Sequence, residues 1–181
     1  MLLVFYVNIL VWTRCFFMGQ FFSFLSAICV CISTFSKKKK GLVTWQILDS
    51  LMVCLSDIFL ISWAAAAVSI LSVIRNVLQV KNKMNLKITI LLLVLIVGLG
   101  LAFNNRGWIG LLAIAASATY TFFMYKTKNA QQMRWALLLN TFLWLIHDIM
   151  IQSYPMIVMG IIIFVMTSFN LARLRKTPNK K

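Results

Sequence analysis

The sequence is a succession of apolar segments, each about long enough to cross a lipid bilayer as a helix. The hydrocarbon core of a bilayer is about 30 Å thick, and an α-helix spans it with roughly 20 residues. Seven segments reach or approach this length: 16–35, 42–60, 62–80, 86–103, 107–125, 133–151 and 154–172. In hydrocarbon each segment must satisfy its own backbone hydrogen bonds, and none alternates in polarity like a barrel strand. The sequence therefore predicts seven transmembrane helices.

The composition excludes a water-soluble protein. Apolar residues make up 62% of the chain and charged residues only 12%, against about 45–50% and about 25% in soluble domains. The seven segments leave no room for a soluble domain, so we expect a single all-α transmembrane domain over residues 1–181. The joins at Ser62–Trp63 and Ser153–Pro155 are tight turns. The alternative is six spans, if the first or the fourth segment does not cross.

The basic residues fall almost entirely on one side of the predicted membrane. If the N-terminus is placed outside, the inner segments hold 16 of the 18 Lys and Arg residues, and the outer segments hold only Arg14 and Arg106. The positive-inside rule then predicts a cytoplasmic C-terminus with a basic tail over 173–181. Neither this tail nor Lys37–Lys40 is interleaved with aromatic residues, so we expect them to contact anionic lipid headgroups and not nucleic acid.

The chain matches itself at an offset of 91 residues. The polar positions that coincide are Asp49–Ser50 with Asn140–Thr141, Asp57 with Asp148, and Ser62 with Ser153. This match predicts a three-helix repeat over 16–80, a linker helix over 86–103 and a second repeat over 107–172. Both repeats start outside, so they are parallel, in a 3+1+3 plan. The alternative is that two hydrophobic hairpins resemble each other by chance.

Several short stretches carry a family resemblance. Gly19–Gln20 opens the first helix, Ile74–Asn76 closes the third, and Arg134–Trp135 leads into Leu143–Ile146. In these stretches and in its topology the chain resembles the YgjV-type family of bacterial inner-membrane proteins over most of its length after Cys15. The resemblance implies a bacterial inner-membrane location rather than an activity.

More distantly, the 3+1+3 plan resembles the SWEET and PQ-loop superfamily, whose members move sugars and other small solutes by rocking two three-helix bundles. Asn76 and Asn170 are similar to the paired asparagines that such carriers use to hold substrate. Prolines in the bundle helices act as hinges there, often in a Pro-Gln pair. This chain departs from that pattern, because its prolines are Pro155 and Pro178 and neither precedes a glutamine.

Residues near the membrane midplane are the candidates for a solute site. Asp49 lies near mid-helix, where a carboxyl group costs about 2.5–3.5 kcal/mol to insert, and such residues usually face a cavity or a partner. Its repeat mate is Asn140, and Trp144 lies one turn further on, placed to stack on a sugar ring. The alternatives are an interhelical hydrogen bond worth about 0.6–2 kcal/mol and a packing or lipid-facing tryptophan.

Other ionisable residues lie nearer the membrane surfaces. Asp57 and Asp148 are close to the outer ends of their helices, where we expect each to bond the turn that follows. His147 and Asp148 are neighbours that point about 100° apart on a helix, so they need not touch. A proton relay through Asp57, His147 and Asp148 is the alternative. Arg75 lies about one turn inside the cytoplasmic edge and is expected to snorkel to the interface.

No motif points to catalysis or to a cofactor. The chain has no glycine-rich phosphate loop, no HExxH and no GxSxG. Its four cysteines lie in or beside the apolar segments without metal-ligand spacing, so we interpret them as buried thiols. They are Cys15, Cys29, Cys31 and Cys54. We therefore expect neither an enzyme nor a metal or cofactor site.

Two functions fit the sequence. The first is a small carrier or facilitator for an uncharged, hydroxylated solute such as a sugar, working by alternating access between two three-helix bundles. The second is a non-transporting membrane scaffold or accessory subunit, whose symmetric polar residues only hold the bundles together. A homo-oligomer fits either function.

Overall fold

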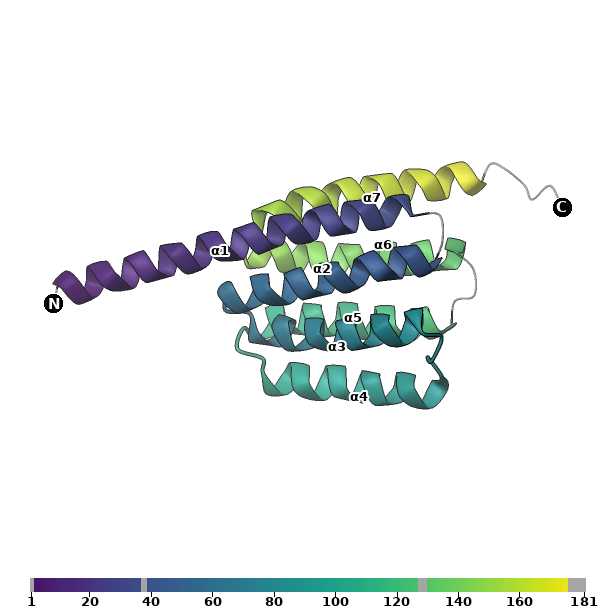
Figure 1. Cartoon of the computed structure of the whole chain (residues 1–181), viewed down its shortest axis with the longest axis horizontal. Coiled ribbons are helices and arrows are strands. Elements are labelled where there is room, and N and C mark those ends of the chain that lie inside the picture. The colour runs from purple at the N-terminus through teal and green to yellow at the C-terminus, as the bar shows by residue number, and fades with distance from the viewer. Residues whose placement is uncertain (1, 37–38, 127–129, 176–181) are drawn as a thin grey trace.

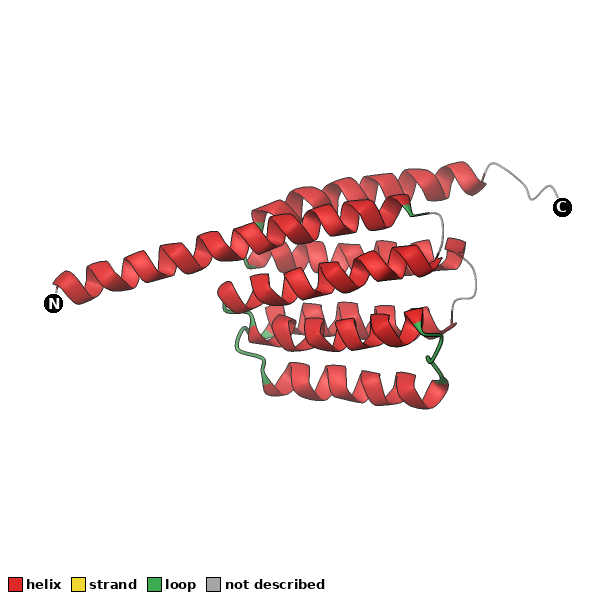
Figure 2. Cartoon of the chain, viewed as in Figure 1, coloured by secondary structure: helices red, strands yellow, loops and turns green. Residues whose placement is uncertain are grey.

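The described part of the chain consists of seven α-helices and contains no strand. The computed structural model describes the backbone of residues 2–36, 39–126 and 130–175, and the side chains of residues 13–33, 36, 40–126 and 135–169. The helices are α1 (Leu2–Phe35), α2 (Lys39–Phe59), α3 (Trp63–Val80), α4 (Leu86–Ala102), α5 (Trp108–Lys126), α6 (Ala130–Met150) and α7 (Tyr154–Arg175). The prediction of an all-helical fold is confirmed (Figure 2).

Four helices contain a stretch long and apolar enough to cross a membrane. These stretches are Thr13–Ser33 in α1, Lys40–Phe59 in α2, Trp63–Val80 in α3 and Trp108–Lys126 in α5. The apolar parts of the other three helices are shorter, and they are Leu86–Ala102, Trp135–Met150 and Tyr154–Phe169. That all seven cross the membrane therefore stays a prediction.

Several helices extend beyond the apolar segments from which they were predicted. The first begins at Leu2 rather than near residue 16, and α2 begins at Lys39, within the lysine run. The last helix continues to Arg175, past the predicted end at residue 172. Lys and Arg are good helix formers, so α2 and α7 continue past their apolar segments into basic residues. The residues from Leu2 to Cys15 are themselves mostly apolar, so α1 extends upstream of its predicted span.

The helices form two layers of three, with α4 at one edge (Figure 1). Within the first layer α1 packs on α2 and α2 on α3, and within the second α5 packs on α6 and α6 on α7. The layers meet where α1 packs on α7 and where α3 packs on α5. Helix α4 packs on α3 and α5. The middle helices, α2 and α6, thus face each other across the space between the layers.

Small residues bring the helices together. At Gly19 of α1, an added Cβ atom would lie 2.9 Å from a side-chain carbon of Leu60. Glycine at this position leaves room for the Leu60 side chain against α1, and small residues are common where membrane helices pack. The buried residues include many serines, whereas large apolar side chains such as Phe24, Val94 and Val165 are exposed. The exterior is apolar, and about half of the buried residues described are polar, whereas the interior of a soluble protein is mainly apolar.

The turns that join α2 to α3 and α6 to α7 have the same backbone geometry. In the first, Ile61 has a φ of 57°, and the N–H of Ser62 donates to the carbonyl oxygen of Asp57 at 2.8 Å. In the second, 91 residues later, Gln152 has a φ of 60° and the corresponding hydrogen bond measures 2.9 Å. Each is a Schellman motif, a helix end closed by one left-handed residue. The repeat in the sequence therefore coincides with a repeated turn.

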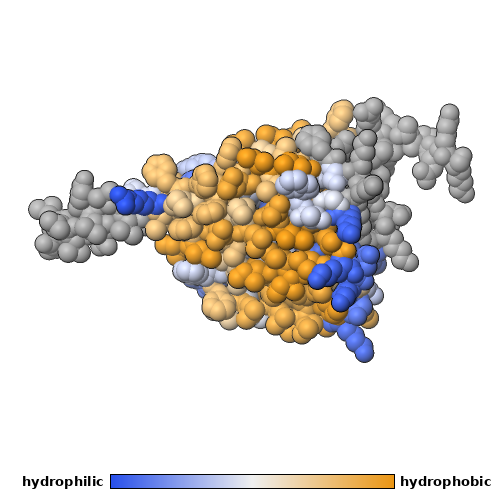
Figure 3. All heavy atoms as spheres, in the orientation of Figure 1, coloured by the Kyte–Doolittle hydropathy of each residue, from blue (hydrophilic) through white to orange (hydrophobic). Residues whose placement is uncertain are grey.

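Basic side chains gather at one end of the helix bundle. The chain reverses direction at each helix, so the first turns of α2 and α4 lie beside the last turns of α3 and α5 (Figure 1). The described lysines at this end, which we call the basic end, are Lys40, Lys81, Lys83, Lys87 and Lys126. Arg14 and Arg106 lie toward the other, far end. Figure 3 shows hydrophilic side chains at the basic end and an apolar band beside them.

Candidate functional site: a polar cavity between two helix layers

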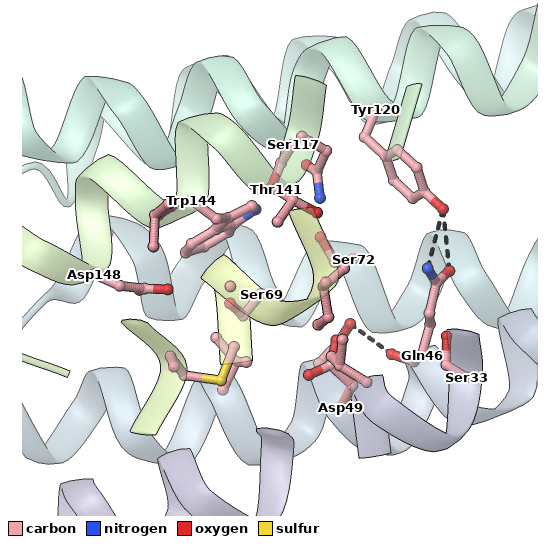
Figure 4. Close-up of a pocket in the computed structure, with 18 of the residues that line it drawn as sticks. Ser33, Gln46, Asp49, Ser69, Ser72, Ser117, Tyr120, Thr141, Trp144 and Asp148 are labelled. Atoms are coloured by element: carbon pink, nitrogen blue, oxygen red, sulfur yellow. Dashed lines mark hydrogen bonds between the residues drawn. The ribbon is translucent and has the colours of Figure 1, made fainter. Parts of the chain in front are cut away.

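A cavity of about 110 Å³ lies between the two layers (Figure 4). This volume accommodates several water molecules or a small solute. Its polar lining consists of Ser23, Ser33, Gln46, Asp49, Ser50, Ser56, Asp57, Ser69, Ser72, Arg75, Asn76, Ser117, Tyr120, Asn140, Thr141, Trp144, Asp148 and Ser153. Side chains of six helices contribute, and no described residue of α4 does.

The three carboxyl groups that line the cavity each have one side-chain hydrogen-bond partner. The Asp49 carboxyl group accepts a hydrogen bond of 2.6 Å from Ser26 Oγ of α1. Asp57 accepts a longer one, of 3.5 Å, from Ser69 of α3. Asp148 lies 3.3 Å from Nδ1 of His147. Most of their partners are therefore neutral hydroxyl groups.

Toward the basic end, Arg75 is enclosed by polar and aromatic groups. It is only 4% exposed. Its Nη1 donates to Thr121 Oγ1 and its Nε to Asn76 Oδ1, both at 3.1 Å, and the guanidinium carbon lies 4.9 Å from the centre of the Tyr120 ring. The hydroxyl group of Tyr120 bonds the amide of Gln46 at 3.1 Å. These contacts join α3 and α2 to α5 across the layers.

Toward the far end, hydroxyl groups connect the layers. Ser23 of α1 bonds both Ser153, in the α6–α7 turn, and Ser56 of α2. On the other side, Ser62 of the α2–α3 turn lies 3.3 Å from Nε2 of His147 on α6. Each turn serine thus reaches the other layer, and hydroxyl groups together with one imidazole join the layers at the far end of the cavity.

Most of the sequence matches a protein-family model. The family is Imp-YgjV, described as a bacterial inner membrane protein, and its model matches residues 17–178. The chain belongs to this family. The resemblance seen in the sequence is confirmed, and the family description assigns the protein to the bacterial inner membrane. Neither the curated proteins nor the solved structures gave a significant match.

The structure brings most of the predicted site residues to one cavity in this Imp-YgjV family member. Asp49, Asn140, Trp144 and Asn76 all line it, from α2, α6 and α3. Asn76 also donates to Ser50 Oγ at 3.4 Å and to the carbonyl oxygen of Gln46 at 3.2 Å. The side chain of Asn170 lies outside the described residues. Over the described residues, no hydrogen bond joins Asp49 to Asn140. The two side chains instead line the same cavity.

The expectations for Asp57 and Asp148 need correction. Their backbone carbonyls, and not their side chains, accept the hydrogen bonds of the following turns. Their carboxyl groups instead line the cavity. His147 is 0% exposed and contacts Asp148, because rotation of the two side chains overcomes the 100° between their positions.

Arg75 was expected to snorkel to the interface, and this prediction is wrong. Its side chain is held inside by Thr121, Asn76 and Tyr120. Because those partners come mainly from another helix, α5, no local sequence pattern reveals them.

Several lining residues were missed by the sequence reasoning. Ser69, Ser72 and Arg75 stand three residues apart along α3, which places them on one face of the helix. Gln46, Asp49 and Ser50 form a similar stripe on α2. Such polar stripes in otherwise apolar helices are the signal that would have found them. In the described part of the chain, no group of three or more His, Cys, Asp or Glu side chains is placed to hold a metal ion.

Proposed function

We propose that the protein is a carrier or facilitator for a small, hydroxyl-rich solute, working by alternating access between its two helix layers. The observation that carries this proposal is the polar cavity at the interface of the layers, lined from six helices. A protein that only needs to hold its helices together gains little from a polar cavity between them, because polar groups are costly to place inside a membrane.

The layers correspond to the two halves of the proposed 3+1+3 plan. Helices α1–α3 form one half and α5–α7 the other, and α4 links them from outside the cavity. The matching turns at Ile61 and Gln152 support this plan. So does the offset of 91 residues that relates Ser26, the partner of Asp49, to Ser117 in the cavity wall. Parallel repeats of this kind carry their solute sites at the repeat interface.

The contacts at the two ends of the cavity would act as alternating gates. The far-end gate consists of the hydroxyl contacts of Ser23 and Ser62, and the basic-end gate of Gln46, Tyr120 and Arg75. Opening one gate while the other stays closed would give the solute access to one side at a time. In the proposed orientation the basic end faces the cytoplasm and its anionic lipid headgroups.

The lining suits a solute with several hydroxyl groups. Eight serines face the cavity, and each hydroxyl group both donates and accepts a hydrogen bond. Asp49 and Asn140 add a carboxyl and an amide group at the centre, and Trp144 offers an aromatic face for a sugar-like ring.

The rival function is a membrane scaffold, and the hydrogen bonds between the layers favour it. The variant Asn140→Leu distinguishes the two, with the lipid-exposed Leu139→Ile on the same helix as the matched control. Flux is measured in liposomes against a panel of labelled sugars and other small solutes. A carrier loses flux in Asn140→Leu but keeps its melting temperature, whereas a scaffold shows no flux in any variant and a shifted melting temperature. Absence of wild-type flux above that of empty vesicles across the panel would refute transport.

A further inference from the structure

The charged side chains that line the cavity do not balance. All three acidic residues of the chain, Asp49, Asp57 and Asp148, line it, whereas Arg75 is the one basic residue among the described lining side chains. His147, which contacts Asp148, adds at most one further positive charge. Three carboxyl groups therefore face one cation, or two when the imidazole is protonated.

The direct contacts of Arg75 are with neutral groups. Its guanidinium group donates to Thr121 and Asn76 and lies over the ring of Tyr120. Over the described residues, no salt bridge joins it to an aspartate. Among the side chains that the structure describes, Asp49 and Asp57 accept hydrogen bonds from the hydroxyl groups of Ser26 and Ser69 alone. Hydroxyl groups donate hydrogen bonds but supply no positive charge.

An occupant with a positive charge removes this imbalance. Acidic side chains inside membrane helices usually pair with a cation or line the path of one, because an unpaired charge in hydrocarbon is costly. In this cavity the protein supplies too few cations of its own. A bound ammonium group would pair with the carboxyl groups that the serines leave uncompensated.

Trp144 provides an independent feature of the same kind. Its indole lines the cavity and packs edge-on against the ring of His147, with 5.1 Å between the ring centroids. Figure 4 shows the indole ring within the cavity, between Asp148 and Thr141. The face of tryptophan is the strongest aromatic partner for an ammonium group. A carboxyl group beside an indole face is a common way to recognise organic cations.

We propose that the cavity binds a small hydroxylated solute that carries an ammonium group. The carboxyl groups of Asp49, Asp57 and Asp148 compensate its charge, the indole of Trp144 packs against it, and the serines bond its hydroxyl groups. This inference rests on the proposed function, because it names the charge class of the solute that the carrier moves.

Paired probes test the charge class with the unmodified protein. Choline is compared with its neutral isostere 3,3-dimethyl-1-butanol, and ethanolamine with 1-propanol, by tryptophan fluorescence and melting temperature of the full chain in detergent. We expect the ammonium member of a pair to bind at least about tenfold more tightly than the neutral member. Equal binding within both pairs, or no binding by any probe, would overturn the proposal.

Variants assign the preference to the cavity. Asp49→Asn and Asp57→Asn each remove one carboxylate with little change in shape, and Lys87→Gln is the control, because this exposed lysine on α4 lies away from the cavity. We expect both aspartate variants to lose most of the preference for the ammonium probe, and the control to keep it. A full preference in both folded aspartate variants would overturn the assignment.

Flux separates this inference from the transport proposal. Labelled choline and ethanolamine are followed into proteoliposomes beside a neutral polyol such as sorbitol. Entry of the polyol without entry of either ammonium solute would support transport but refute the proposal that the solute carries an ammonium group. Selective binding of the ammonium probes without any flux would support the ammonium site but refute transport.

Discussion

At the scale of single residues, the cavity depends on side chains that bond across the layers. The Tyr120–Gln46 pair is the clearest case, because both side chains are buried and they come from different helices. Removing the hydroxyl group leaves the amide of Gln46 without its partner on α5. The cost of such a loss in a membrane protein is smaller than in water-soluble cores, since the unfolded chain also finds partners in the bilayer.

We therefore predict that Tyr120→Phe lowers the free energy of unfolding by about 0.6–2 kcal/mol. Tyr125→Phe is the matched control, since Tyr125 is 40% exposed on the same helix and has no side-chain hydrogen bond in the described structure. Reversible unfolding in mixed micelles measures both. Equal losses in the two variants would show that the Gln46 contact contributes nothing.

The individual polar residues were only partly predictable from the sequence. Asp49 and Asn140 stood out because polar groups in apolar helices are costly and because they coincide in the repeat. The roles of Arg75 and Tyr120 were not predicted, since they depend on contacts between helices. Arg75 of α3, for example, bonds Thr121 of α5, which lies 46 positions later in the sequence. The spacing of polar residues within one helix predicts which face of that helix is polar. It does not predict which side chains of another helix that face contacts.

At the scale of elements, the turn after α2 holds one residue in an unfavourable backbone conformation. Ile61 is β-branched and has a φ of 57°, a region in which such residues are rare. Its side chain is 44% exposed, so it contributes little packing. The backbone carbonyl is the functional part, since it accepts hydrogen bonds from Asn105 at 2.9 Å and Arg106 at 3.1 Å.

We predict that Ile61→Gly raises the free energy of unfolding by about 1 kcal/mol, because glycine adopts this conformation without strain. Ile58→Gly is the control. It lies within α2 with a similar exposure of 37%, and there glycine should cost about 1 kcal/mol. Thermal unfolding of the two variants should shift in opposite directions, and shifts of the same sign would contradict the Schellman turn.

The elements themselves were largely predictable, and their ends were not. Seven apolar segments matched seven helices in the right order, because a long apolar stretch favours a helix, whose backbone groups bond within the segment. The ends moved outward at Leu2, Lys39 and Arg175, since a helix does not stop where the hydrophobic residues do. The tight turn at Ser62–Trp63 was predicted because the mostly apolar stretch from Leu42 to Val80 is too long for one span.

At the scale of the whole molecule, the orientation in the membrane follows from the basic end. We predict that green fluorescent protein fused after Lys83 fluoresces and that alkaline phosphatase fused there is inactive. Fusions after Asn105 should behave in the opposite way, because that turn lies at the far end. Both reporters are compared at equal expression, and the reverse pattern would show that the basic end faces outward.

Alternating access makes a further prediction about the far-end gate. In a variant without the four native cysteines, Ser23→Cys combined with Ser153→Cys should form a disulfide on oxidation, because the two hydroxyl groups are in contact. Oxidation should then abolish solute flux, and a reducing agent should restore it. The cysteine-free parent is the control, and undiminished flux through the cross-linked protein would exclude opening at this end.

The arrangement of the two layers was beyond the reach of the sequence. The offset of 91 residues predicted two similar halves, but not that α2 and α6 would be the helices separated by a cavity. That depends on which faces pack, at α1 with α7 and at α3 with α5. Small residues contribute to these approaches, since an added Cβ atom at Gly110 of α5 would lie 3.3 Å from the Cβ atom of Ala64 on α3. Their effect depends on the opposing helix.

The hydroxyl groups at the far end have an energetic consequence for motion. A gate of ion pairs would have to separate charges to open, and that work would keep it shut for long periods. Ser23, Ser153 and Ser56 form neutral hydrogen bonds, and each can be exchanged for a bond to water at a net cost of only about 0.5–1.5 kcal/mol. Exchanging the two bonds of Ser23 would cost about 1–3 kcal/mol, so these contacts would oppose opening of this end less than ion pairs would.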